Sequence, residues 1–135
     1  MRVYYEFQFS EQPEDAFQKL IESMDDTEIW RGHLEIKRID QNNRESILAF
    51  RKKKQIEWVG RRKEDLSIMI KYGDGPLKGY QIIQVLQDKI LIRIDIKMRG
   101  LWYPFTRFAV SHILEGEINA LYRLFPPDSS QERIK

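Results

Sequence analysis

One acidic residue of this sequence falls among apolar neighbours. Near the end of the chain, apolar residues recur at helical spacing, and Glu117 lies on their face between Ile113 and Leu121. An ionised carboxylate among apolar side chains is costly unless it meets a basic or hydroxyl partner, water, a ligand head group or a proton. A salt bridge would make Glu117 structural, whereas a protonated carboxyl in a cavity could act as a general acid or base. We therefore predict that Glu117 faces the interior and has such a partner there.

Two arginines could supply the positive charge. Alternation along the predicted strands puts Arg38 on the same face as Leu34 and Ile36, and it favours an inward Arg51 more weakly. A guanidinium at the rim of a cavity could bind a ligand carboxylate through two parallel hydrogen bonds. Each arginine could equally mark the solvated end of a strand.

Other residues could line or gate a cavity. Tyr5 and Tyr72 are the hydroxyl candidates for the carboxylate, and Gly116 leaves room in the helix for either close packing or a ligand. The aromatic run at residues 102–105 could be a gate for an apolar ligand, a lip that touches a membrane, or a packed corner. The predicted ligand-binding residues are Arg38, Arg51, Tyr5, Trp58, Tyr72, Trp102, Phe105, Ala109, Ile113, Gly116 and Glu117.

Common catalytic and metal-binding motifs are missing. The chain has no cysteine, which excludes disulfides, thiolate nucleophiles, Cys-type zinc sites and iron–sulfur clusters. It has no Gly-rich phosphate loop, HExxH motif or nucleophile elbow. Its two histidines, His33 and His112, are expected at the surface. We predict no catalytic residue, no metal site and no cofactor.

Charge and composition indicate a globular protein without a strongly charged partner. In 135 residues there are 23 basic and 21 acidic residues, and the hydrophobic fraction is 41%. The basic runs at residues 51–54 and 61–63 would lie at opposite ends of one strand, as solvated hairpin corners. No nucleic-acid partner is expected, although either corner could meet an anionic membrane surface transiently.

The spacing of apolar residues predicts a mostly antiparallel β protein that ends in a long helix. We expect a strand over residues 1–9, a helix from Pro13, a second short helical turn at residues 25–30, and a last helix from Pro104 to Leu124. Six further strands are expected at residues 33–40, 45–52, 55–60, 65–72, 77–87 and 89–98, with turns that include residues 53–54.

This order of elements predicts an α+β fold with two layers. A curved seven-stranded antiparallel sheet would wrap around the long C-terminal helix, with two short helices after the first strand. Residues 1–125 would form a single ligand-binding domain, and residues 126–135 a flexible tail. A cavity between the helix and the sheet is the natural place for a small molecule.

The same order resembles the helix-grip superfamily. The resemblance rests on FSEQPEDAFQKLIESMDD after the first strand and GLWYPFTRFAVSHILEGEINALYRLF at the end, and it covers about residues 1–125. This superfamily includes the START lipid-transfer domains, the birch-pollen-allergen-like proteins and the polyketide cyclase-like domains. The resemblance implies a hydrophobic ligand between the long helix and the sheet. Small size, missing cysteine and Ile-rich strands also resemble an archaeal branch of the superfamily from thermoacidophiles that is associated with fatty-acid carriage.

These observations favour a cytoplasmic binder or carrier of a hydrophobic ligand, above all a long-chain fatty acid or similar lipid, rather than an enzyme. Two alternatives stay open. One is an enzyme of the cyclase or dehydratase kind that uses Glu117 for proton transfer. The other is an interaction module that binds polyanions through its basic hairpin corners, with steep salt dependence. The sequence does not fix the oligomeric state.

Overall fold

The structure is a computed structural model that describes residues 1–49 and 51–126, and of Arg51 only the backbone. The tail predicted at residues 126–135 therefore lies outside the described residues except for Pro126. In chain order the elements are β1 (Arg2–Gln8), α1 (Pro13–Ser23), β2 (His33–Arg38), β3 (Asn43–Leu48), β4 (Arg51–Arg62), β5 (Ser67–Tyr72), β6 (Leu77–Val85), β7 (Lys89–Met98), the short 3-10 helix η1 (Gly100–Phe105) and α2 (Thr106–Leu124).

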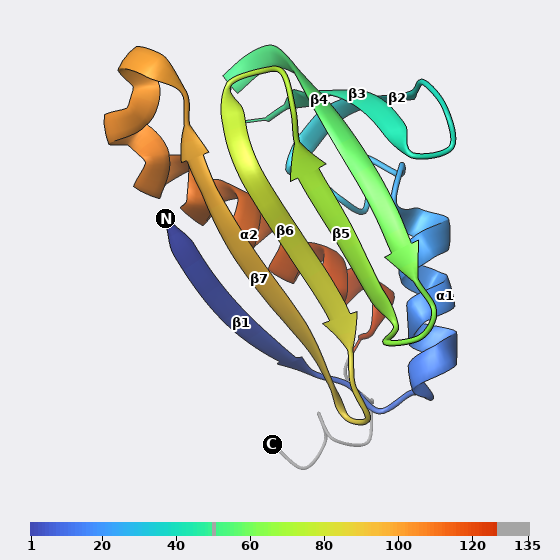
Figure 1. Ribbon diagram of the computed structural model, residues 1–135. Helices are drawn as coiled ribbons and strands as arrows, with labels where there is room; N and C mark the ends of the chain where they lie inside the picture. Colours follow the sequence, from blue (N-terminus) through green and yellow to red (C-terminus); the bar gives the residue numbers. More distant parts are fainter. Residues whose placement is uncertain (50, 127–135) are drawn as a thin grey trace.

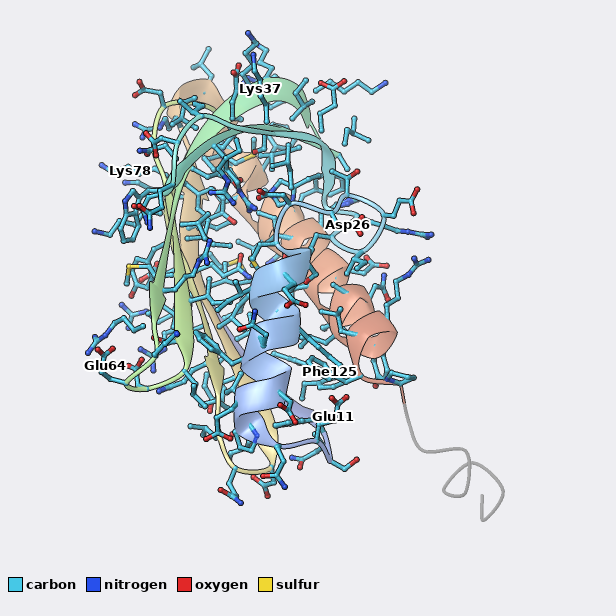
Figure 2. All side chains as sticks on the ribbon, turned by 90° about the vertical axis from the view of Figure 1, so that its right-hand side faces the viewer. Glu11, Asp26, Lys37, Glu64, Lys78 and Phe125 are labelled. Carbon is cyan, nitrogen blue, oxygen red and sulfur yellow. The ribbon has the colours of Figure 1, made fainter. Side chains whose placement is uncertain are left out.

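The seven strands form one antiparallel sheet in the order β1-β7-β6-β5-β4-β3-β2. Every connection from β2 to β7 joins neighbouring strands, as short turns require, and β1 closes the other edge against β7. Both helices lie on the same side of the sheet, and the strands β2 to β4 curl over one end of them (Figures 1 and 2). The predicted α+β helix-grip architecture is confirmed.

The core lies between the sheet and the two helices. Alternate residues of β7 point inward and are almost completely buried, which explains the isoleucine at every second position: Ile90, Ile92, Ile94 and Ile96. Burying each such side chain contributes roughly 1.5–3 kcal/mol. From α2, the side chains of Ala109, Val110, Ile113, Ala120 and Leu121 complete this layer.

Two local predictions were wrong. Residues 25–30 form hydrogen-bonded turns instead of a second helix. The amides of Ile29 and Trp30 both donate to the carbonyl of Asp26, and the chain then turns into β2 before a helix can continue. The turn expected at residues 53–54 lies inside β4, since β3 already ends at Leu48 and β4 begins at Arg51. The pairing of β3 with β4 shifts between Ile47 and Leu48, so that Leu48 pairs with Arg51 and the connection between the two strands comes earlier than predicted.

The long helix begins later than predicted. Pro104 lies inside η1, and α2 starts at Thr106. The Thr106 hydroxyl fixes this junction, because it donates to the carbonyl of Tyr103 (2.7 Å) and accepts from the amide of Met98 (3.0 Å). Among the described residues, no helix is both long enough and apolar enough to cross a membrane.

Gly79 allows β6 to pass close to β7. Its φ is +126°, and a Cβ there would meet the carbonyl oxygen of Asp95 on β7. We expect Gly79→Ala to lower the free energy of unfolding by about 2 kcal/mol, because the side chain adds both backbone strain and a clash with main chain. Urea denaturation followed by circular dichroism measures this change.

Gly32→Ala is the matched control, because a Cβ at Gly32 has no heavy atom within 4 Å. Its free energy of unfolding should stay within about 0.5 kcal/mol of the wild type. An equal loss in both variants would contradict the close approach at Gly79.

Candidate functional site

A row of buried polar side chains crosses the sheet on the face that α2 covers. Direct strand pairing aligns Arg38 of β2, Arg44 of β3, Glu57 of β4, Tyr72 of β5 and Gly79 of β6. The first of these is half-buried, and the next three are buried. Polar residues at inward positions of adjacent strands are unusual in a small core, where each must find a partner.

Glu57 is the centre of this row and is fully buried. Its Oε1 accepts from Arg44 Nε at 2.7 Å, and its Oε2 accepts from the Ser46 hydroxyl at 3.0 Å. The ring of His33 also reaches Oε2, through Nε2 at 3.1 Å. Because a carboxylate only accepts, His33 Nε2 carries the proton in this contact. One carboxylate thus links β2, β3 and β4 on the inner face.

Arg44 continues the network toward α1. Its Nη1 donates to the main-chain carbonyl of Met24 at 2.7 Å and to Asp25 at 3.2 Å. Asp25 also accepts two hydrogen bonds from Arg38, at 2.6 and 3.0 Å. The guanidinium of Arg44 is therefore satisfied on both sides, and the turn after α1 is tied to β2 and β3.

A second group lies beside the first and includes a residue of α2. The Tyr72 hydroxyl donates to Gln81 Oε1 at 3.1 Å, and the Gln81 side chain lies next to Glu117. Tyr72, Gln81 and Glu117 are all buried. Four buried atoms of the combined cluster have no hydrogen-bond partner among the described residues: His33 Nδ1, Arg38 Nη1, Gln81 Nε2 and Glu117 Oε2.

The pKa values separate the two carboxyl groups. Burial acts to raise the pKa of Glu57, but the neighbouring His33 and Arg44 outweigh it and lower this pKa to about 2. At Glu117 burial dominates, and it raises the pKa to about 7 although His33, Gln81 and Arg44 act to lower it. Glu57 is thus a permanent anion, whereas Glu117 changes its protonation state near neutral pH.

The tyrosine between these carboxyls stays neutral. Burial is the main cause that raises the pKa of Tyr72 well above its ordinary value, with the negative charges of Glu57 and Glu117 adding to it. Near neutral pH its hydroxyl therefore donates and accepts hydrogen bonds but does not lose its proton. The cluster as a whole offers a neutral hydroxyl, an amide, an imidazole and a titrating carboxyl in one buried place.

The helix phase predicted from the sequence is confirmed for Glu117, which is only 3% exposed. Among the side chains that the structure describes, none of the predicted basic or hydroxyl partners bonds to it directly. Arg38 bonds to Asp25 instead, and the hydroxyl of Tyr72 points to Gln81. Tyr5 lies at the other end of α2 next to Tyr122, where burial raises its pKa.

The remaining predicted site residues lie in three different places. Ala109, Ile113 and Gly116 lie on the buried face of α2, which also carries Glu117. Trp58 points to the outer face, where its ring covers Gly60 and carries the Lys71 ammonium 5.3 Å above it. Two more, Trp102 and Phe105, are exposed on η1. The side chain of Arg51 lies outside the described residues.

Sequence reasoning missed most of the cluster. Glu57 was not among the predicted site residues, and His33 was expected at the surface, but both are buried. The signal that could have revealed them is period two: Arg44 and Ser46 alternate in phase with Leu48, and Glu57 alternates with Val59. In β6, Gln81 is likewise in phase with Ile83.

The region between α2 and the sheet is largely filled by side chains. A hollow of about 190 Å³ opens at the surface between Ile113 and Gly116 of α2 and residues Gly32 and Ala49, which flank the β2–β3 hairpin, and Glu117 is not part of its lining. A Cβ on Gly116 would come within 3.1 Å of the Gly32 amide nitrogen, so the helix and this turn are in close contact. Among the described residues, no three His, Asp or Glu side chains are grouped so as to hold a metal ion.

We expect Glu57→Gln to destabilise the protein by roughly 3–5 kcal/mol, because it leaves the buried guanidinium of Arg44 without its counter-charge. Urea denaturation at pH 7 measures the loss. The matched control is Glu45→Gln, which breaks a largely exposed pair with Lys54 and should cost less than about 1 kcal/mol. Equal effects of the two changes would contradict a central role for Glu57.

We expect Glu117 to make the stability depend on pH. Its folded pKa of about 7 lies above the ordinary value of 4.5, so the stability that its buried neutral form contributes is complete below pH 4.5. This contribution declines as the pH rises from 4.5 to 7 and is absent above that, a change of about 3 kcal/mol. The free energy of unfolding of Glu117→Gln, relative to that of the wild type, should therefore increase by this amount between pH 4 and pH 8.

Denaturation at several pH values checks this expectation, with Glu115→Gln as the control because Glu115 is exposed on the same helix. The difference between that control and the wild type should not change with pH. A pH-independent difference for Glu117→Gln would show that Glu117 is not a buried neutral carboxyl.

Comparison with known proteins supports the fold. No protein-family model and no curated protein sequence matches the chain. Among solved structures, TTHA0849 from Thermus thermophilus is similar, with a TM-score of 0.72 and 10% identity over 92% of this chain and 93% of that one. Ara h 8.0201 is similar with a TM-score of 0.59 and 12% identity, over 90% of this chain and 94% of the other.

A third similar structure is a hypothetical protein from Sulfolobus tokodaii, with a TM-score of 0.58 and 17% identity over 90% of this chain and 96% of that one. Identities this low show a shared fold and nothing finer. Together with the seven-stranded sheet and the C-terminal helix, these likenesses establish that the chain has the helix-grip fold.

Proposed function

We propose that this protein binds a small hydrophobic molecule with a polar head, and that a long-chain fatty acid is the ligand. The head would lie at the buried cluster formed by His33, Gln81 and Glu117, and the apolar body between α2 and the sheet. The observation that carries the proposal is that three of the four buried polar atoms without partners among the described residues belong to these side chains: His33 Nδ1, Gln81 Nε2 and Glu117 Oε2. Such atoms cost about 1–3 kcal/mol each unless a ligand or water satisfies them.

The chemistry of these atoms suits a carboxylic acid. Gln81 Nε2 can only donate, so it needs an acceptor such as a carbonyl oxygen. His33 donates through Nε2 to Glu57, so its Nδ1 accepts a hydrogen bond when the ring carries one proton and donates one when it carries two. A carboxylic acid head supplies one oxygen that accepts and one proton to donate, and Glu117 with a pKa of about 7 can share that proton.

The hollow beside Gly116 is the place where we propose that the ligand enters between α2 and the sheet. It is lined by Gly116, the residue before Glu117 on α2, but its volume of about 190 Å³ is below the 300–1,000 Å³ usual for ligand pockets. Binding a long chain therefore requires α2 and the turn at Gly32 to separate. Small residues on the buried face of α2, Ala109 and Ala120 besides Gly116, leave few side-chain contacts to break.

The finer parts of this proposal come from the sequence. A cytoplasmic location, one domain over residues 1–125 and membership of the archaeal fatty-acid-carrying branch stay predictions. The fold of the similar structures supports a ligand of the hydrophobic class and does not select a fatty acid.

We expect purified protein to bind fatty acids of about 12–18 carbons saturably, with native mass spectrometry and calorimetry as the measurements. Gln81→Leu should weaken binding about tenfold, because it removes the free donor at the head group. The control is Gln84→Leu, which changes the outer face of the same strand, where Gln84 bonds to the Asp65 carbonyl. Binding that never saturates, or an equal effect of both variants, would refute the proposal.

One observation favours a second candidate, an enzyme of the cyclase or dehydratase kind. A buried carboxyl with a pKa of about 7 is suited to proton transfer near neutral pH. Under this alternative, Glu117→Gln would abolish turnover of a bound carbonyl compound while leaving its binding within a few-fold of the wild type. A carrier would instead show ligand release without any chemical change.

A further inference from the structure

The connection between β7 and α2 exposes a concentrated set of large apolar side chains. Within residues 101–108, five of them are 46–94% exposed, with Leu101 the most exposed. We call these residues the apolar tip: Leu101, Trp102, Tyr103, Phe105 and Phe108. Scattered apolar residues are normal on a protein surface, but five within eight residues form a patch that calls for a partner.

The apolar tip is held in this outward arrangement. Gly100 begins η1 with a φ of +62°, which turns the chain away from the sheet. The hydroxyl of Thr106 then ties η1 to both Met98 and Tyr103, and the buried side chain of Thr106 occupies the inner side of the junction. Since these contacts fix the backbone, the tip cannot fold its apolar side chains back into the core.

Basic residues surround the apolar tip. Trp102 lines a hollow together with Lys53 and Lys54 of β4 and with Arg99, which follows β7. Four more exposed basic residues lie near the same ends of the strands and helix: Lys52, Lys78, Lys97 and Arg107. Figure 1 places η1, the start of β4 and the β5–β6 connection at one end of the molecule, and Figure 2 labels Lys78 at that end.

The balance of charge at this end is positive. Residues 97–108 contain three basic residues and no acidic one. Acidic residues also approach this end: Asp74 in the β5–β6 connection, Glu45, which pairs with Lys54 at 3.1 Å, and Glu35, which lines a hollow with both. At the other end of β4, Arg62 lies 4.0 Å from Asp65.

We infer that the apolar tip inserts into the surface of an anionic lipid bilayer. Tryptophan and tyrosine favour the interface between lipid and water, and a protruding leucine and phenylalanines can enter the acyl region. The basic residues around them match negatively charged headgroups, each contributing a Coulombic attraction that weakens within a Debye length of the surface. This inference rests on exposed side chains and does not depend on the ligand proposed for the interior.

Vesicle flotation and tryptophan fluorescence test the inference with the full chain. With vesicles of phosphatidylcholine containing about 30% phosphatidylserine, we expect at least roughly tenfold stronger partitioning than with pure phosphatidylcholine. Raising the salt from about 0.1 M to about 0.5 M should reduce this partitioning by roughly tenfold, because it screens the charges. The Trp102 emission should shift to the blue on binding.

Two pairs of variants separate the apolar and the basic contributions. Leu101→Asp should reduce partitioning roughly tenfold, whereas Ile39→Asp should not, although Ile39 is also exposed and the charge change is the same. Removing two charges near the tip with Lys52→Gln and Lys53→Gln should weaken partitioning roughly fivefold. Removing two positive charges at the other end of β4 with Arg61→Gln and Lys63→Gln should weaken partitioning by less than half as much.

Three outcomes would overturn the inference. These are equal partitioning of Leu101→Asp and the wild type, equal partitioning to neutral and anionic vesicles, and self-association in ultracentrifugation that Leu101→Asp abolishes. The last would assign the tip to contact between copies of this chain. Loss of fatty-acid binding with intact vesicle partitioning would refute only the function proposed above, so the two failures can be told apart.

Discussion

The ion pair between Glu57 and Arg44 constrains the half of the sheet that curls over the helices. The two residues face each other across β3 and β4, and both are withdrawn from water. Desolvating them is costly, and the fold compensates with hydrogen bonds from Ser46 and His33 to the carboxylate. Because these partners come from different strands, a shift of register in β2 or β3 would leave a buried charge unpaired. The pair thus specifies how this edge of the sheet is assembled.

The same charges determine how Glu117 behaves. His33 and Arg44 bond directly to Glu57 and lower its pKa, whereas at Glu117 burial outweighs the effect of the same two groups and raises the pKa. Two acidic residues in one cluster therefore take opposite roles: one is a fixed anion that holds the sheet together, and the other is poised to gain or lose a proton. This division places the titrating carboxyl on the buried face of α2 and the fixed anion on the sheet.

Much of the architecture follows from the sequence, and the site follows only in part. Strict alternation in β7 and helical spacing in α2 identify those elements, and the phase of α2 alone predicts that Glu117 is buried. In β3, apolar residues occupy both faces at Ile47 and Leu48, so alternation does not decide which face is inside. Periodicity can put Arg44 in phase with Leu48 and Glu57 in phase with Val59, but that the two meet each other depends on pairing across strands, which periodicity within one strand does not contain.

The bulge at the start of β2 has a consequence beyond the turning of one side chain. Pairing with β3 skips from His33 to Glu35, so Leu34 is turned outward on the last strand of the sheet. An irregular, charged outer strand presents a poor template for another chain, because a regular ladder of main-chain hydrogen bonds cannot form along it. Glu35 and Lys37 add charges on the same strand. The irregularity that buries His33 beside Glu57 thereby also protects an open seven-stranded sheet from growing edge to edge into an aggregate.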